Sequence, residues 1–242
     1  MKKTILTVFL FASVFSSGGL LAAGTFNWAG PYVGLHQGFA DRSSDWTDII
    51  NGYEGTIHHP FADNGTQGGV GGITAGYNFV LSSPYVIGLE GDFAFGESLD
   101  GSDPCYGSYT EYSATCSSET NWVGDIGIRL GMQAMDRMLL FVKGGGAFGS
   151  FDYHVTDLIG FTDPDYPTET ETQIGWLVGG GIEYAVIDHA TVRLEGNYMD
   201  FGEHQVDFHQ NPNTCIDCYN VDFGTDIDES MWVVKLGINL KF

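Results

Sequence analysis

Apolar and polar residues alternate along the segment 232–242 at the end of the chain. The apolar positions are Trp232, Val234, Leu236, Ile238, Leu240 and Phe242, and the intervening ones are Val233, Lys235, Gly237, Asn239 and Lys241. A period of two predicts a β-strand with one apolar and one more polar face. A helix would instead bring Lys235 and Asn239 onto the face that carries Trp232 and Leu236.

Seven earlier segments show the same alternation, although it is weaker where Leu139 and Phe141 fall on the more polar side. The segments are Pro31–Phe39, Gly71–Phe79, Tyr85–Phe95, Trp122–Leu130, Met138–Phe148, Ile174–Val186 and Ala190–Tyr198. The chain therefore carries eight predicted strands of about ten residues, the length that crosses a bilayer when a strand is tilted.

The connections between these strands alternate in length. Residues 41–66, 97–119, 152–172 and 202–229 are long and polar, whereas the connections near Ser82–Pro84, Gln133–Asp136 and Ile187–His189 are short. Both ends of the strand series lie on the short-turn side. The pattern predicts an all-β fold, an eight-stranded antiparallel up-and-down transmembrane β-barrel with short periplasmic turns and four long extracellular loops.

The positions of the charges distinguish a membrane barrel from a soluble barrel, because a soluble barrel would carry its charges on the outside. The strand cores have no charge on the apolar face, as lipid requires. The other face carries glycines and charged residues, which suit a narrow, packed lumen. The predicted lumen charges are Glu90, Asp92, Asp125, Arg129, Lys143, Glu183, Arg193, Glu195 and Lys235.

Aromatic residues on the apolar face fall into two belts, as the two membrane interfaces predict. The inner girdle, near the short turns, consists of Tyr77, Phe79, Tyr85, Tyr184 and Phe242. The outer girdle, near the long connections, consists of Phe39, Phe93, Phe95, Trp122, Phe148, Trp176, Tyr198 and Trp232. A soluble β-sandwich, the alternative fold, has no reason to sort its aromatic residues in this way.

The first 24 residues have the pattern of a secretory signal peptide. Lys2 and Lys3 precede an apolar stretch from Ile5 to Phe15, and small residues follow at 22–24. We therefore expect residues 1–24 to be removed and residues 25–242 to form the barrel domain. The net charge of −22 argues against a nucleic-acid partner, because phosphate binding needs a basic surface.

Several motifs carry a family resemblance that covers the whole mature chain. They are Trp28-Ala29-Gly30-Pro31-Tyr32-Val33-Gly34, Gly72-Ile73-Thr74-Ala75-Gly76-Tyr77-Asn78, Val142-Lys143-Gly144-Gly145-Gly146-Ala147, Gly179-Gly180-Gly181-Ile182-Glu183-Tyr184, Arg193-Leu194-Glu195 and the terminal Lys241-Phe242. With them the sequence resembles the eight-stranded outer-membrane β-barrel family of surface antigens, opacity proteins and hemin-binding-type proteins. The family is functionally mixed, so the resemblance implies the barrel more strongly than any one activity.

The resemblance implies a location and a set of partners. We expect the protein in the outer membrane of a Gram-negative bacterium, in contact with membrane lipid and lipopolysaccharide. Phe242 looks like the assembly signal that the barrel-assembly machinery reads. The loops would meet a host or surface ligand, since function commonly resides in loops held by a rigid scaffold.

The lumen charges allow two interpretations. In the first, they form an internal ion-pair network that fills the barrel, because unpaired buried charges are costly. In the second, they line a narrow ion path. An eight-stranded barrel leaves an interior just wide enough for side chains, which favours the first interpretation.

The long connections hold most of the acids and all of the cysteines. The acids include Asp163, Asp165, Glu169, Glu171, Asp217, Asp222, Asp226, Asp228 and Glu229. They predict a solvated, repulsive surface, with divalent-cation capture as the alternative. The cysteines predict local disulfides, Cys105 with Cys116 and Cys215 with Cys218, because the protein is exported. Bridging between loops is another connectivity, and His204 and His209 leave open a zinc site at the second pair.

Enzymatic signals are weak. The chain has no G-x-S-x-G turn and no H-E-x-x-H pair, and Ser150 and His154 are too far apart on an extended strand to hydrogen bond. The pair His58-His59 leaves hemin binding as a hypothesis. We predict no catalytic residue, resident metal or cofactor. The expected function is surface interaction, adhesion or envelope integrity, with a narrow porin-like channel and hemin or cation binding by the loops as alternatives.

Overall fold

The computed structural model describes residues 26–52, 55–63, 65–97, 99–106, 113–156, 168–208 and 223–242. Within these ranges only the backbone is described for residues 48–63, 96–97, 103–106, 113–114, 155–156, 208 and 223–224. The expected signal peptide, residues 1–24, lies outside the described residues. The described part of the chain contains no helix that is long and apolar enough to cross a membrane.

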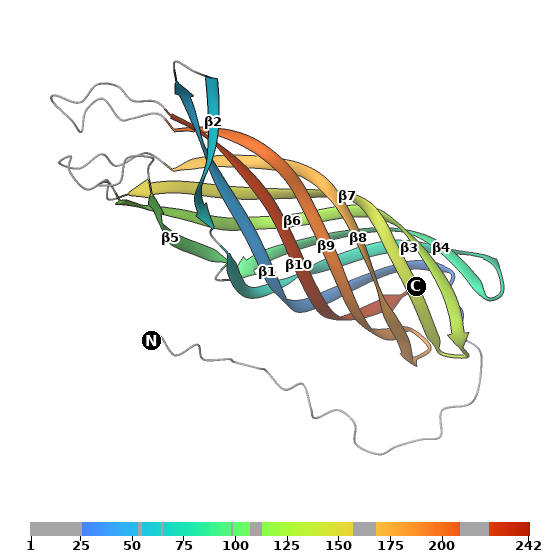
Figure 1. Cartoon of the computed structure of the whole chain (residues 1–242). Coiled ribbons are helices and arrows are strands. Elements are labelled where there is room, and N and C mark those ends of the chain that lie inside the picture. The colour runs from blue at the N-terminus through green and yellow to red at the C-terminus, as the bar shows by residue number, and fades with distance from the viewer. Residues whose placement is uncertain are drawn as a thin grey trace.

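Eight strands form a closed ring in which every neighbouring pair is antiparallel (Figure 1). In chain order they are β1 (Gly30–Gly52), β3 (Thr66–Ser82), β4 (Tyr85–Glu97), β6 (Ser113–Met135), β7 (Met138–Thr156), β8 (Glu169–Ile187), β9 (Ala190–Phe208) and β10 (Phe223–Lys241). The first and last strands close the ring, with Tyr32 opposite Lys241 and Asp48 opposite Thr225. Every predicted strand lies within one of these eight, apart from Phe242, which follows the end of β10, so the predicted eight-stranded barrel is confirmed.

The strands are longer than the sequence pattern predicts, and much of the four long connections is therefore strand. The eight strands of the ring contain between 13 and 23 residues. Two further strands, β2 (Gly55–Asp63) and β5 (Asp100–Tyr106), form hairpins with β1 and β6 at the end that carries the long connections (Figure 1). The expectation of strands of about ten residues joined by long loops is wrong at this end of the barrel.

Side chains alternate between the two faces of the barrel wall, as the period of two requires. On β10, Trp232, Leu236 and Ile238 are more than half exposed, whereas Lys235 and Asn239 are buried in the lumen. On β7 the weaker alternation has a structural meaning, because the inward-facing Leu139 and Phe141 are buried apolar residues. The band between the two girdles therefore has an apolar exterior and a largely polar interior.

Beyond the outer girdle the polarity of the two faces changes. Trp46, Phe151, Phe201, Val206 and Ile227 are fully or almost fully buried inside the ring and belong to one apolar cluster. On the exterior the exposed residues at this level include carboxylates, among them Asp45, Glu203 and Asp228. The end of the barrel that carries the long connections therefore has an apolar core of its own.

Candidate functional site: the charged lumen

All nine predicted lumen charges are buried inside the ring, and none is more than 8% exposed. They come from β4 (Glu90, Asp92), β6 (Asp125, Arg129), β7 (Lys143), β8 (Glu183), β9 (Arg193, Glu195) and β10 (Lys235). Each takes part in at least one ion pair within 4 Å. We call these nine residues the lumen network.

The contact between Arg193 and Glu90 crosses the full width of the barrel. The guanidinium donates through Nη1 to Oε2 at 2.5 Å and through Nη2 to Oε1 at 3.0 Å, which makes the pair bidentate. Glu90 lies on β4 and Arg193 on β9, which are four strands apart in either direction around the ring. Because side chains from diametrically opposite strands touch, the middle of the lumen is occupied at this level by protein atoms.

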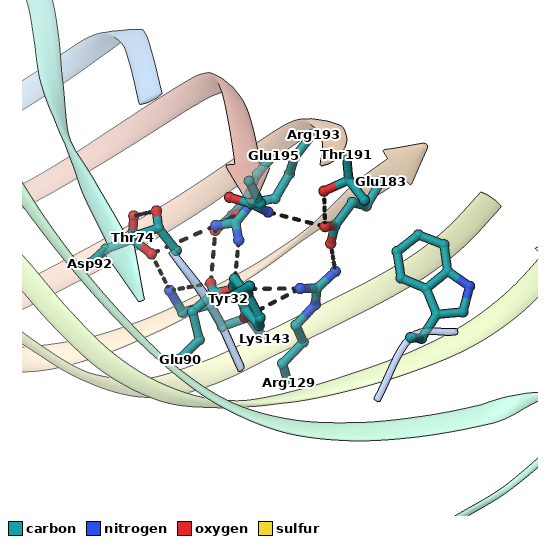
Figure 2. A network of polar contacts seen from close by, with 12 residues as sticks. Tyr32, Thr74, Glu90, Asp92, Arg129, Lys143, Glu183, Thr191, Arg193 and Glu195 are labelled. Carbon is teal, nitrogen blue, oxygen red and sulfur yellow. Dashed lines mark hydrogen bonds and ion pairs between the residues drawn. The ribbon is translucent and has the colours of Figure 1, made fainter. Parts of the chain in front are cut away.

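Lys143 joins three carboxylates at the centre of the network, and two of them, Glu90 and Asp92, are labelled beside it in Figure 2. Its Nζ lies 2.9 Å from Glu90 Oε1, 2.9 Å from Asp92 Oδ2 and 2.5 Å from Asp125 Oδ1. Asp92 receives a second ammonium, since Lys235 Nζ lies 2.9 Å from its Oδ1. Charges removed from water need such close partners, because the desolvation cost of an isolated ion is large.

Arg129 extends the network toward the inner girdle. Its guanidinium pairs with Glu183 and lies 3.9 Å above the centroid of the Phe141 ring, a distance that suits a cation–π interaction. Glu183 also accepts hydrogen bonds from the Thr191 hydroxyl at 2.5 Å and from the Asn239 amide at 3.0 Å. The buried Phe141, which the sequence placed on the polar face, thus packs against a charged member of the network.

Three carboxylates of the network lie close enough together to hold a metal ion. Oxygens of Glu90, Asp92 and Glu195 are within 4.8 Å of one another. The same carboxylates already contact Lys143 and Arg193, which Figure 2 labels, and Lys235. Because protein cations occupy the position that a metal would take, the donor set fits an ion-pair cluster rather than a metal centre.

A second polar cluster lies above the outer girdle, and sequence reasoning missed it. Arg42 Nε is 3.1 Å from Glu229 Oε2, and the Ser44 and Tyr153 hydroxyls donate to Glu229 Oε1 at 2.6 and 3.1 Å. Arg42 also donates to the Thr120 hydroxyl at 2.7 Å on the other side of the ring. We call Arg42, Ser44, Thr120, Tyr153 and Glu229 the upper cluster.

The assignment of Glu229 to a solvated acidic surface is therefore wrong, because its side chain is completely buried. The signal was present in the sequence. The inward positions of the last strand continue back from Lys235 at every second residue, through Val233 and Met231 to Glu229. Among the other acids, Glu169 and Glu171 lie in β8 and Asp226 and Asp228 in β10, whereas Asp163, Asp165, Asp217 and Asp222 lie outside the described residues.

The remaining candidates are only partly described. Cys116 is fully buried on β6. The register places Cys105 of β5 opposite Ala114, which lies two residues before Cys116 on β6. Cys215, Cys218 and His209 lie outside the described residues, as do the side chains of His58 and His59. The disulfide, zinc and hemin hypotheses stay predictions. Phe242 is exposed at the end of β10, and its amide donates to the Pro31 carbonyl at 3.1 Å.

Comparison with known proteins identifies the family. The family described as outer membrane protein beta-barrel domain matches residues 7–239. The chain belongs to this outer-membrane β-barrel family. It is 30% identical over 235 residues to the 31 kDa outer-membrane immunogenic protein of Brucella melitensis, covering 90% of this chain and 85% of the relative. It is 28% identical to the 22 kDa outer membrane protein of Rhizobium leguminosarum bv. viciae, covering 98% of this chain and 99% of that protein.

Two solved outer-membrane proteins share the fold. OprG of Pseudomonas aeruginosa aligns with a TM-score of 0.50 at 13% identity, over 91% of this chain and 98% of that one. The outer membrane protease OmpT of Escherichia coli aligns with a TM-score of 0.53 at 10% identity, over 88% and 96%. At these identities the likeness concerns the fold alone. The family and the relatives place the protein in the outer membrane of a Gram-negative bacterium.

Proposed function

We propose that this protein is a non-enzymatic, non-conducting membrane anchor that presents an acidic, folded stalk at the cell surface. The stalk is the part of the barrel beyond the outer girdle, residues 42–52, 55–63, 99–106, 113–120, 150–156, 168–174, 200–208 and 223–230. Its role would be contact with other surfaces, in adhesion or in maintaining the envelope. The relatives named outer-membrane immunogenic proteins support exposure of such a surface.

The observation that carries the proposal is the direct contact of Arg193 with Glu90 across the ring. Shorter bridges between strands that are not neighbours support it. Arg129 on β6 reaches Glu183 on β8, and Lys143 on β7 reaches Glu90 on β4. Ion conduction needs a continuous path of water, and side chains that meet in the middle of a narrow barrel take that space.

The charge distribution supports the role of the stalk. Of the nine Lys and Arg residues, two precede residue 24, and the other seven are Arg42, Arg129, Arg137, Lys143, Arg193, Lys235 and Lys241. All of these seven except Arg137 are buried in the lumen. The exterior of the stalk therefore carries acids with no lysine or arginine to offset them. Such a surface attracts cationic groups and repels polyanions over about one Debye length.

Single-channel recording in a planar bilayer tests the proposal. Folded protein, verified by its heat-modifiable electrophoretic mobility, should give no discrete conductance steps. The Arg137→Met variant, which changes a cation outside the lumen, is the matched control and should be equally silent. Discrete steps in the wild-type protein whose size changes on Lys143→Glu would contradict the proposal and establish the narrow channel instead.

A further inference from the structure

A short segment before β1 crosses the mouth of the barrel at its periplasmic end. The Phe26 amide donates to the Asp136 carbonyl at 3.1 Å, in the turn between β6 and β7. Four residues later the chain enters β1 at Gly30. The β6–β7 turn and β1 lie on opposite sides of the ring. The segment Phe26–Ala29 therefore spans the lumen opening from one side to the other.

Two side chains of this segment are buried in the mouth. Phe26 and Trp28 are 7% and 2% exposed, and their rings pack edge to face with centroids 4.7 Å apart. They form one apolar cluster with Val86 of β4, Leu139 of β7 and Ala185 of β8. Aromatic side chains contribute large buried areas, so two of them are enough to cover the opening of an eight-stranded barrel.

The last strand holds the segment in place. Lys241 Nζ, one residue from the end of the chain, donates to the Trp28 carbonyl at 2.5 Å and lies 5.8 Å from the centroid of the Phe26 ring. The Lys241 side chain can reach Trp28 only when β10 is paired with β1. Closure of the ring is thus a condition for this contact.

Gly30 directs the chain from the barrel wall across the mouth. Its φ of +109° lies in a region that residues with a side chain rarely adopt, and an added Cβ would lie 3.0 Å from the Phe242 carbonyl oxygen. The turn therefore depends on glycine at this position.

We propose that Phe26–Ala29, which we call the latch, closes the periplasmic mouth of the barrel, and that the Lys241 ammonium holds the latch in place. The latch is a seal separate from the lumen network, since it rests on apolar packing, the hydrogen bond of the Phe26 amide to the β6–β7 turn and one ammonium–carbonyl bond. The latch takes this position once β10 has paired with β1. The last step of barrel closure therefore also closes the periplasmic end of the lumen. The proposal goes beyond the anchoring role and does not depend on it.

Thiol labelling of the folded, full-length protein tests the latch. The reporter is Leu139→Cys, in a background in which the four native cysteines are serine, because Leu139 is fully buried in the same apolar cluster as Phe26 and Trp28. A small hydrophilic maleimide should label it slowly. Adding Trp28→Ala should raise the labelling rate at least about tenfold, because a local seal and not global folding protects the thiol.

Two further variants make the result specific. Lys241→Met removes the ammonium that donates to the Trp28 carbonyl. It should also accelerate labelling, by less than Trp28→Ala. Trp232→Ala removes a tryptophan of the same size from the lipid-facing outer girdle and should leave the rate unchanged. Equal rates in all four proteins, each shown to be folded by heat-modifiable mobility, would overturn the latch. Conductance is not the readout here, so the latch can fail while the anchor proposal stands, and the reverse.

Discussion

The same eight strands build two halves with opposite polarity, one on each side of the outer girdle. In the membrane-spanning half the interior holds charges such as Arg129 and Lys143, and the exterior is apolar. In the stalk the interior holds Trp46, Phe151 and Ile227, and the exterior carries carboxylates. The surroundings decide which face is apolar, since lipid excludes charge from the outside and water permits it.

The ionic interior of the spanning half is a consequence of the membrane. A chain that must show apolar residues to lipid on alternate positions has polar residues left for the other face, and these must find partners there. Once the strands leave the bilayer, the apolar residues return to the interior, as in a soluble protein. The upper cluster, with Arg42 paired to Glu229, lies within that apolar core.

The largest effect should come from breaking the lumen network at its centre. Lys143→Met leaves Glu90, Asp92 and Asp125 without their shared ammonium, and we expect a loss of about 4 kcal/mol in the free energy of unfolding. Urea unfolding in lipid vesicles measures it. Arg137→Met is the control, because its pair with the exposed Asp188 should contribute less than about 1 kcal/mol. Equal effects of the two substitutions would remove the distinction between the two kinds of ion pair.

A smaller effect should distinguish the exterior of the membrane-spanning half from the exterior of the stalk. Leu236 faces lipid halfway between the girdles on β10, so Leu236→Arg should destabilise the protein by about 3 kcal/mol. Ser230→Arg places the same side chain on the same strand above Trp232 and should change stability by less than about 0.5 kcal/mol. The same unfolding experiment compares them. A cost for Ser230→Arg as large as that for Leu236→Arg would mean that the stalk does not begin at the outer girdle.

The smallest effect should be a gain of stability. On the exterior of the stalk Asp228 lies directly opposite Asp45 on β1 and Glu203 on β9. Like charges facing each other across strands are destabilising, so Asp228→Lys should stabilise the protein by about 0.5 kcal/mol. The gain should disappear in high salt, where exposed charges are screened. A loss of stability at low salt would show that the acidic row is already neutralised by bound cations.

The spanning half could be predicted from sequence because lipid enforces a strict alternation there. In the stalk the alternation continues on β10 back to Glu229, but β-bulges interrupt it on β6 and β9. At the outer girdle β6 has an extra residue, Asn121, between two paired positions, and β9 has one at Phe201. Each bulge reverses which alternate positions point inward. A period continued from the spanning half therefore fails on these two strands, where Thr120 and Val206 are buried at positions that this period would place outside.

The members of the lumen network could be predicted, but their pairing could not. That Glu90 and Arg193 point inward follows from alternation along β4 and β9. That they meet follows from the stagger of the strands around the ring, which brings residues 103 positions apart to the same level. The upper cluster needed the same information, since Arg42 and Thr120 meet across the lumen from strands that are not neighbours.

The long strands make the stalk a rigid extension of the barrel wall. β1 runs without interruption from the membrane to Gly52, thirteen residues beyond Phe39 of the outer girdle. With the tilt of barrel strands this carries the tip about 30 Å above the bilayer. Continuous hydrogen bonding to β10 leaves no hinge along that distance up to Asp48. A pull on the tip, from an antibody or an attached surface, would thus be transmitted as a torque on the barrel itself, where the aromatic girdles resist tilting.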